Sequence, residues 1–72
     1  MSTKEIFAKR LQGSIKEKET SVYKVAKELR LNEKSLGNWV NGRNEPTITT
    51  LKLLADYFNV CADYLIGRQD WY

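Results

Sequence analysis

Hydrogen-bonding side chains gather at helical spacing in one short segment, "NEKSLGNWVN", residues 32–41. Positions 33, 37 and 41 (Glu33, Gly37 and Asn41) form one row of i, i+4 spacing, and Lys34 and Asn38 form a second row beside it. Carboxylate, ammonium and carboxamide groups on one helix face can exchange hydrogen bonds with a polar partner, and the edges of nucleic-acid bases are such a partner. The pattern therefore predicts recognition through hydrogen bonds, with plain solvent exposure as the alternative.

The composition argues against catalysis and against a bound metal. The chain has no histidine, so it lacks an imidazole general base and an ordinary zinc site. It has no glycine-rich phosphate loop, and its serine, cysteine and aspartate residues show no triad-like grouping. Its one cysteine, Cys61, cannot form an internal disulfide. We expect no enzyme, no cofactor and a small core that depends on helix packing or oligomerisation.

Charge and hydropathy restrict the partners and the compartment. Residues 1–43 hold ten Lys/Arg and five Asp/Glu, whereas residues 44–72 hold two and four. A cationic half suits an anionic partner such as nucleic acid. A solvated surface of mixed charge is the alternative, because it could have the same charge balance. The longest uncharged run, residues 35–42, is too short to span a bilayer, and the N-terminus has no apolar signal segment. We expect a soluble cytoplasmic protein with no membrane partner.

Capping residues and breakers divide the chain into short helices. N-cap candidates are Ser2 (in a capping box with Glu5), Thr20 or Ser21, Asn32 and Thr47. Apolar residues recur at helical spacing behind them: Phe7, Leu11, Ile15, Val22, Val25, Ala26, Leu29, Leu51, Leu54, Ala55 and Phe58. Residues 41–46, "NGRNEP", read as a loop, and residues 62–66 as a last short helix ended by Gly67. We predict a single all-α domain, residues 1–72, with five helices and a tail at 68–72.

The second and third of these helices are separated by only about three residues. Two short helices joined so tightly cross steeply, which is the helix-turn-helix arrangement. Leu36, Trp39 and Val40 share the inner side of the third helix, opposite the polar rows. We place Trp39 in the core together with Phe7, Phe58 and Leu65.

Residues 21–68, "SVYKVAKELRLNEKSLGNWVNGRNEPTITTLKLLADYFNVCADYLIGR", resemble the Cro/phage-repressor (XRE-type) helix-turn-helix family. The landmarks that carry the resemblance are Ala26, Leu36, Trp39, Asn41-Gly42, Pro46 and the closing "NVCADYLIG". The resemblance implies a compact lambda-repressor-like domain with its helix-turn-helix at about 21–41. Small regulators of temperate bacteriophages, such as Cro and the modulator-of-repression proteins, are similar in size.

Several positions depart from the family pattern. Arg30 stands where the turn usually has glycine, and Val22 where a phosphate-clamping glutamine is common. Ser14 and Thr20 replace frequent leucines. These departures bear on the strength of DNA binding rather than on the fold.

The resemblance also implies roles for individual residues. The residues that would read base edges are Glu33, Lys34, Ser35 and Asn38. Those that would contact the DNA backbone are Ser21, Tyr23, Lys24, Asn41, Arg43 and Asn44. Structural alternatives remain open: Glu33 also suits the start of a helix, Asn41 also suits a helix end, and Lys24 and Arg43 also suit a solvated surface.

The aromatic C-terminus, "DWY", either folds back on the body or meets a partner. Together with the last helix it forms the expected protein–protein surface, Tyr64, Trp71 and Tyr72. Two functions follow from these features. The first is a sequence-specific DNA-binding regulator of the phage Cro/repressor type, acting as a homodimer on double-stranded DNA. The alternative is an interaction module that acts as an antirepressor or co-repressor by binding a partner repressor, with an antitoxin as a third form of the same idea.

Overall fold

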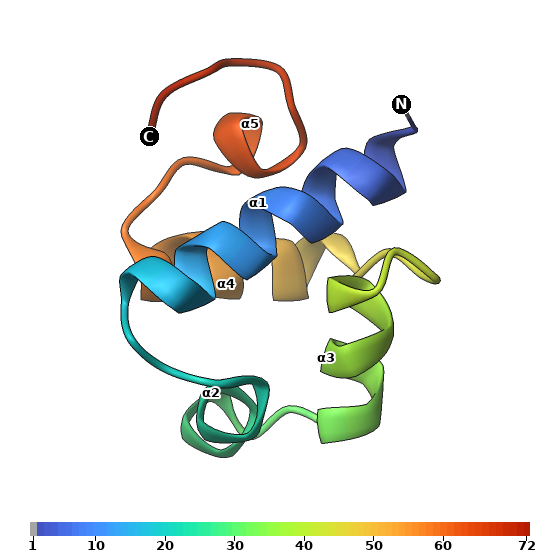
Figure 1. Cartoon of the computed structure of the whole chain (residues 1–72), viewed down its shortest axis with the longest axis vertical. Helices are drawn as coiled ribbons and strands as arrows, with labels where there is room; N and C mark the ends of the chain where they lie inside the picture. Colours follow the sequence, from blue (N-terminus) through green and yellow to red (C-terminus); the bar gives the residue numbers. More distant parts are fainter. Residues whose placement is uncertain (1) are drawn as a thin grey trace.

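The computed structural model describes residues 2–72, and within this range the chain forms five α-helices and no strand (Figure 1). The helices are α1 (Thr3–Glu17), α2 (Val22–Leu29), α3 (Glu33–Val40), α4 (Ile48–Phe58) and α5 (Ala62–Leu65). The all-α prediction and the order of its helices are confirmed. None of the helices in the described range is both long and apolar enough to cross a membrane.

Side-chain caps begin the first four helices. The Ser2 hydroxyl accepts from the Glu5 amide at 3.3 Å, and the Glu5 carboxylate accepts from the Ser2 amide at 3.0 Å, which forms the predicted capping box. The bond from the Ser2 amide lowers the pKa of Glu5 below its ordinary value. The other three caps are Ser21, Asn32 and Thr47, which accept from the amides of Lys24, Ser35 and Thr50. Each cap contributes about 1 kcal/mol to the start of its helix.

Left-handed residues end α2 and α4. Arg30 has φ 57° and ψ 40°, and Asn59 has φ 57° and ψ 44°. In both cases the next amide bonds back five residues, from Leu31 to Ala26 and from Val60 to Ala55, and so satisfies a carbonyl at the helix end. Asparagine tolerates this conformation, whereas at Arg30 it costs about 1 kcal/mol.

Every helix contributes a fully buried side chain to one core. These side chains are Phe7 and Leu11 from α1, Val25 from α2, Leu36 from α3, Leu54 from α4 and Leu65 from α5. Trp39 and Phe58, which were also expected in the core, are half-buried and pack against its edge.

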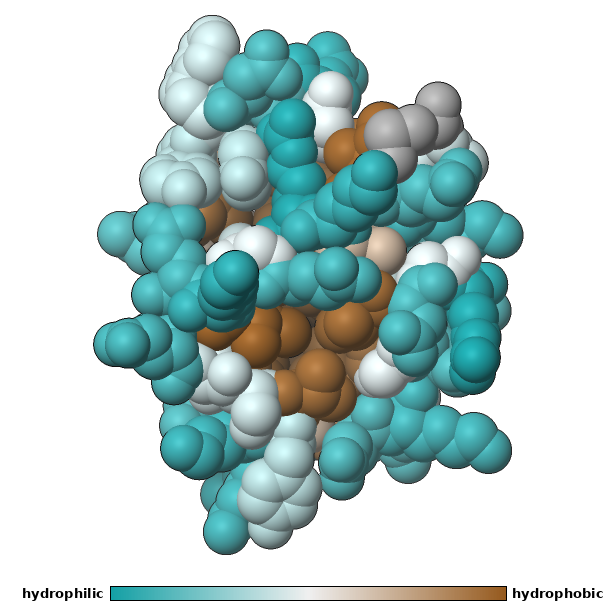
Figure 2. Space-filling view, in the orientation of Figure 1, coloured by the Kyte–Doolittle hydropathy of each residue, from teal (hydrophilic) through white to brown (hydrophobic). Residues whose placement is uncertain are grey.

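The helices cross rather than run in parallel. α1 crosses in front of α4 in Figure 1, and it contacts both α3 and α5. α2 is seen end-on in the same view while α3 is seen from its side, so the two cross steeply, as their short connection predicts. Apolar surface is visible between α1, α2 and α3, with hydrophilic side chains around it (Figure 2). α3 is therefore held by contacts with both α1 and α2.

Candidate nucleic-acid interface

A buried leucine fixes the orientation of α3 and of its two polar rows. The α3 helix begins at Glu33, directly after its cap Asn32, and its Leu36 side chain is completely buried. Because Leu36 fixes the rotation of the helix, the residues on the opposite side face outward. The structure leaves Glu33 and Lys34 exposed, and Ser35, Gly37 and Asn38 partly exposed.

The predicted base readers are not engaged with the rest of the chain. Within residues 2–72, the side chains of Glu33, Lys34 and Asn38 make no hydrogen bond and no ion pair. The Ser35 amide donates to the Asn32 side chain at 3.1 Å, so the backbone of this residue takes part in the cap. A carboxylate, an ammonium and a carboxamide are thus available to an external partner from one helix face.

The residues expected at the DNA backbone fall on two short segments next to α3. The first segment, residues 21–24, is the start of α2, and the second, residues 41–44, follows the end of α3. The six predicted residues, Ser21, Tyr23, Lys24, Asn41, Arg43 and Asn44, are all exposed. Two of them also have structural roles, because Ser21 caps α2 and Asn41 ends α3. The geometry therefore brings together a polar helix face and a flanking segment at each end of it.

A contact that sequence reasoning missed fixes the end of α3. The Gln12 side-chain amide of α1 donates to the Val40 carbonyl at 2.6 Å. Next to it Gly42, with φ 76°, lies close to α1, since a Cβ at this position would be 3.7 Å from the Ala8 Cβ. Helix α1 thereby positions the loop that carries Asn41 and Arg43. No local signal marks Gln12 for this role, because its partner is 28 residues away.

A shallow hollow lies beside the polar rows, between the starts of α2 and α3. It is lined by Val22, Asn32, Glu33, Lys34 and Gly37. Val22 is partly buried and packs against the core. The position where the family often has a phosphate-clamping glutamine therefore presents an apolar surface to this hollow.

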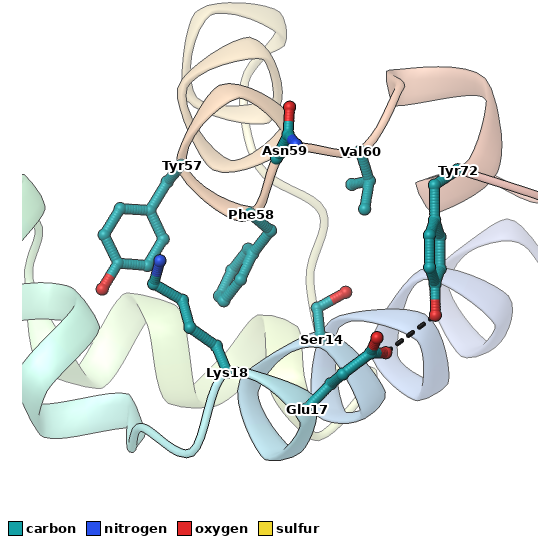
Figure 3. A pocket seen from close by; sticks show the side chains of 8 residues that line it. All are labelled: Ser14, Glu17, Lys18, Tyr57, Phe58, Asn59, Val60 and Tyr72. Carbon is teal, nitrogen blue, oxygen red and sulfur yellow. Dashed lines mark hydrogen bonds between the residues drawn. The ribbon is translucent and has the colours of Figure 1, made fainter.

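The C-terminal tail folds back along α1. The Tyr72 hydroxyl donates to the Glu17 carboxylate at 2.7 Å (Figure 3), and the Tyr72 ring meets the Tyr64 ring edge-on at 4.9 Å between centroids. The bond to Glu17 raises the pKa of Tyr72 above its ordinary value. Trp71 nevertheless stays 70% exposed. Of the three residues predicted for a partner surface, Tyr64 and Tyr72 contact each other and Trp71 points outward.

Arg10 of α1 holds this tail, and the sequence did not indicate it. Its guanidinium donates to the carbonyls of Tyr64 at 2.9 Å and Gln69 at 2.6 Å, and it lies 4.3 Å from the Tyr64 ring centroid. An ion pair with Asp70, 3.4 Å long and largely exposed, adds little. The tail is therefore an ordered part of the domain.

The comparisons with known proteins agree with this geometry. The family described as helix-turn-helix matches residues 15–65. The solution structure of the SOS-response transcriptional repressor LexA from Eubacterium rectale is similar, with a TM-score of 0.84 and 30% sequence identity. The similarity covers 89% of this chain and 68% of that one. No curated protein sequence matches the chain significantly.

Proposed function

Because the chain belongs to the XRE-type helix-turn-helix family of DNA-binding transcription regulators, we propose that it is a sequence-specific regulator of the phage Cro/repressor type. Its α3 helix enters the major groove, and Glu33, Lys34, Ser35 and Asn38 contact base edges. Asn38 pairs with adenine N6 and N7, Lys34 donates to guanine and Glu33 accepts from cytosine N4. The protein acts by occupying a promoter, with no covalent chemistry.

One observation carries this proposal: on the side of α3 opposite the buried Leu36, the side chains of Lys34 and Asn38 have no partner within residues 2–72. A helix rotated by the spacing of one residue would turn those groups by about 100° and bury part of them. The major groove, about 12 Å wide, admits a helix of this kind. The small side chain of Ser35 and the lack of one at Gly37 allow the backbone to approach the bases closely.

The flanking segments supply contacts that do not depend on base sequence. Lys24 and Tyr23 at the start of α2, and Arg43 with Asn44 after α3, contact phosphates on either side of the groove. Such contacts fix the register of α3 on the duplex. The protein binds as a symmetric homodimer, so the two half-sites lie about one helical turn, roughly 34–36 Å, apart.

The test is selection from random double-stranded DNA followed by affinity measurements over a range of salt concentrations. We expect one palindromic sequence class, with log K falling linearly as log salt rises. Arg43→Ala should reduce this slope by about one unit at every sequence, whereas Lys34→Ala should relax the preference at one base position. Lys52→Ala serves as control, because Lys52 lies on α4 and pairs with Asp56 at 3.0 Å. Failure to select any sequence would contradict the proposal.

A second function is favoured by the exposure of Trp71. A large aromatic side chain that is 70% exposed on an ordered tail is suited to a protein interface, where tryptophan is enriched. In this second proposal the protein acts as an antirepressor or co-repressor, and Trp71 anchors a partner repressor. The DNA-binding face can stay functional at the same time, because the tail runs along α1 and α5 rather than α3.

The two functions are separated by adding a repressor encoded in the same genome. A tight complex that is lost in Trp71→Ala, together with weak DNA binding by the protein alone, supports the second function. Tight sequence-specific DNA binding that is unchanged by Trp71→Ala supports the first. In the wild-type protein, Trp71 fluorescence should change when a bound repressor buries this side chain.

A further inference from the structure

Nothing in the packing or the backbone of the domain explains why residue 37 of α3, Gly37, is a glycine. It lies in the middle of an eight-residue helix, where glycine lowers helix stability relative to alanine. A Cβ added there would meet nothing within 4 Å, and its φ lies outside the left-handed region, so neither packing nor backbone geometry requires glycine. What the missing side chain provides is open space on the outer surface of the helix.

That space belongs to the hollow between the starts of α2 and α3. Val22 is the only apolar side chain among the residues that line it, and the others that have side chains, Asn32, Glu33 and Lys34, carry hydrogen-bonding groups. Val22 is fixed in place because its inner part packs against the core. The hollow thus combines one rigid apolar wall, one open side at Gly37, and donors and acceptors around them.

This combination matches the major-groove edge of a single base. Thymine presents a 5-methyl group beside its O4 acceptor, and no other DNA base has an apolar group on that edge. We propose that Val22 and Gly37 form a binding site for the methyl group of one thymine in each operator half-site. The inference rests on the proposed DNA-binding function and assigns one base of the operator to one place on the protein.

The two residues have different roles in this site. Val22 supplies the apolar contact, at the position where the family often has a phosphate-clamping glutamine instead. Gly37 leaves room for the base edge. The gain in binding compensates for the lower helix stability that glycine causes. The site is a determinant of specificity, because a cytosine at this position lacks the methyl group.

The experiment replaces thymine by uracil, one position at a time, in an operator selected with the wild-type protein. This exchange removes the methyl group and leaves every hydrogen-bonding atom unchanged. We expect affinity to fall about fourfold per half-site at one thymine, the effect of one buried methyl group. In Val22→Thr, which keeps the shape of the side chain and makes it polar, the difference between thymine and uracil should fall below about twofold at that position.

Gly37→Ala tests the open side and has a matched control. Its added methyl group should weaken binding to the thymine operator while the melting temperature rises, because alanine favours the helix. Gly13→Ala is the control, since Gly13 also lies inside a helix with nothing within 4 Å of an added Cβ. Gly13→Ala should raise the melting temperature and leave DNA affinity unchanged.

The outcomes separate this inference from the function on which it rests. If no sequence is selected from random DNA, the proposed function itself fails. If a sequence is selected and uracil is tolerated at every thymine, the methyl site is disproved while the DNA-binding function stands. Equal affinity of wild type and Gly37→Ala for the selected operator also overturns the inference.

Discussion

Two faces of this domain use their polar groups in opposite ways. On the α3 face, the side chains of Glu33, Lys34 and Asn38 have no partner within residues 2–72. On the face formed by α1, α5 and the tail, the side chains are tied to one another. Arg10 holds two carbonyls there, and Tyr72 holds Glu17.

The difference indicates that the face formed by α1, α5 and the tail stabilises the fold, whereas the α3 face is available for binding. A polar group that is already paired contributes to folding and has less to offer a ligand, whereas an unpaired group contributes little to folding and can bind. Both faces are anchored in the core, by Leu36 on one side and Leu65 on the other, and the Gln12 side chain of α1 also bonds the Val40 carbonyl of α3. Substitutions on the α3 face should therefore change binding with little change in stability, and substitutions on the tail face should do the reverse.

The largest effect is expected where the α3 face meets the core. Leu36→Ala removes a completely buried side chain and should lower the free energy of unfolding by about 3 kcal/mol. Leu53→Ala is the matched control, since Leu53 on α4 is 38% exposed and its loss should cost under about 1 kcal/mol. Urea denaturation followed by circular dichroism measures both. Equal losses for the two variants would show that burial of Leu36 does not hold α3.

The tail face is tested by Arg10→Ala. The carbonyls of Tyr64 and Gln69 lose a charged donor, so the free energy of unfolding should fall by about 2 kcal/mol and Trp71 fluorescence should change. Asp70→Asn should cost less than about 0.5 kcal/mol, because the ion pair is exposed. DNA affinity measured at a temperature where the variant is folded should stay at the wild-type value. A large loss of affinity in folded Arg10→Ala would mean that the two faces are coupled.

Local and distant interactions differ in how far the sequence predicts them. The sequence predicts the caps Ser2, Asn32 and Thr47 because each bonds an amide only three residues away. The left-handed backbone at Arg30 agrees with its position, where the family usually has glycine. The polar rows of α3 followed from helical spacing alone, and their exposure agrees with it.

The interactions that sequence reasoning missed join residues far apart in the chain. Arg10 bonds the Gln69 carbonyl across 59 residues, and the Tyr57 hydroxyl donates to Glu28 across 29 residues. Arginine and glutamate are ordinary on a helix surface, so nothing local distinguishes these two from solvated charges. Their roles depend on the packing of the folded helices, which spacing does not specify.

A smaller effect is expected at the turn that leads into α3. Arg30→Gly removes the strain of a left-handed arginine, which is about 1 kcal/mol, and adds freedom to the unfolded chain. The net result should be a gain of about 0.5 kcal/mol in the free energy of unfolding. Asn59→Gly at the end of α4 is the matched control and should give almost no gain, because asparagine accepts the left-handed conformation. Thermal denaturation distinguishes the two, and a loss of stability in Arg30→Gly would show that the arginine side chain stabilises the turn.

The smallest effect is a change in tail docking at high pH. The pKa of Tyr72 is raised from its ordinary value of 10.0 because its hydroxyl donates to the Glu17 carboxylate. A raised pKa in the folded state means that the contribution is complete below the ordinary value and is lost as pH rises through the folded value. Trp71 fluorescence should therefore change in wild type above about pH 10.

Tyr72→Phe is the control for this titration, because it lacks the hydroxyl and is otherwise identical to wild type. The alkaline change in Trp71 fluorescence should be smaller in this variant. Identical titration curves for the two proteins would show that the contact with Glu17 does not hold the tail.

The side-chain caps at the starts of the first four helices have a consequence for how fast the domain assembles. Each cap joins groups three residues apart, so a helix can begin before any distant part of the chain has arrived. Helical domains built from such nearby contacts reach the native state in microseconds to milliseconds. A freshly synthesised copy could therefore be ready to work almost as soon as it leaves the ribosome, so synthesis rather than folding would set the delay.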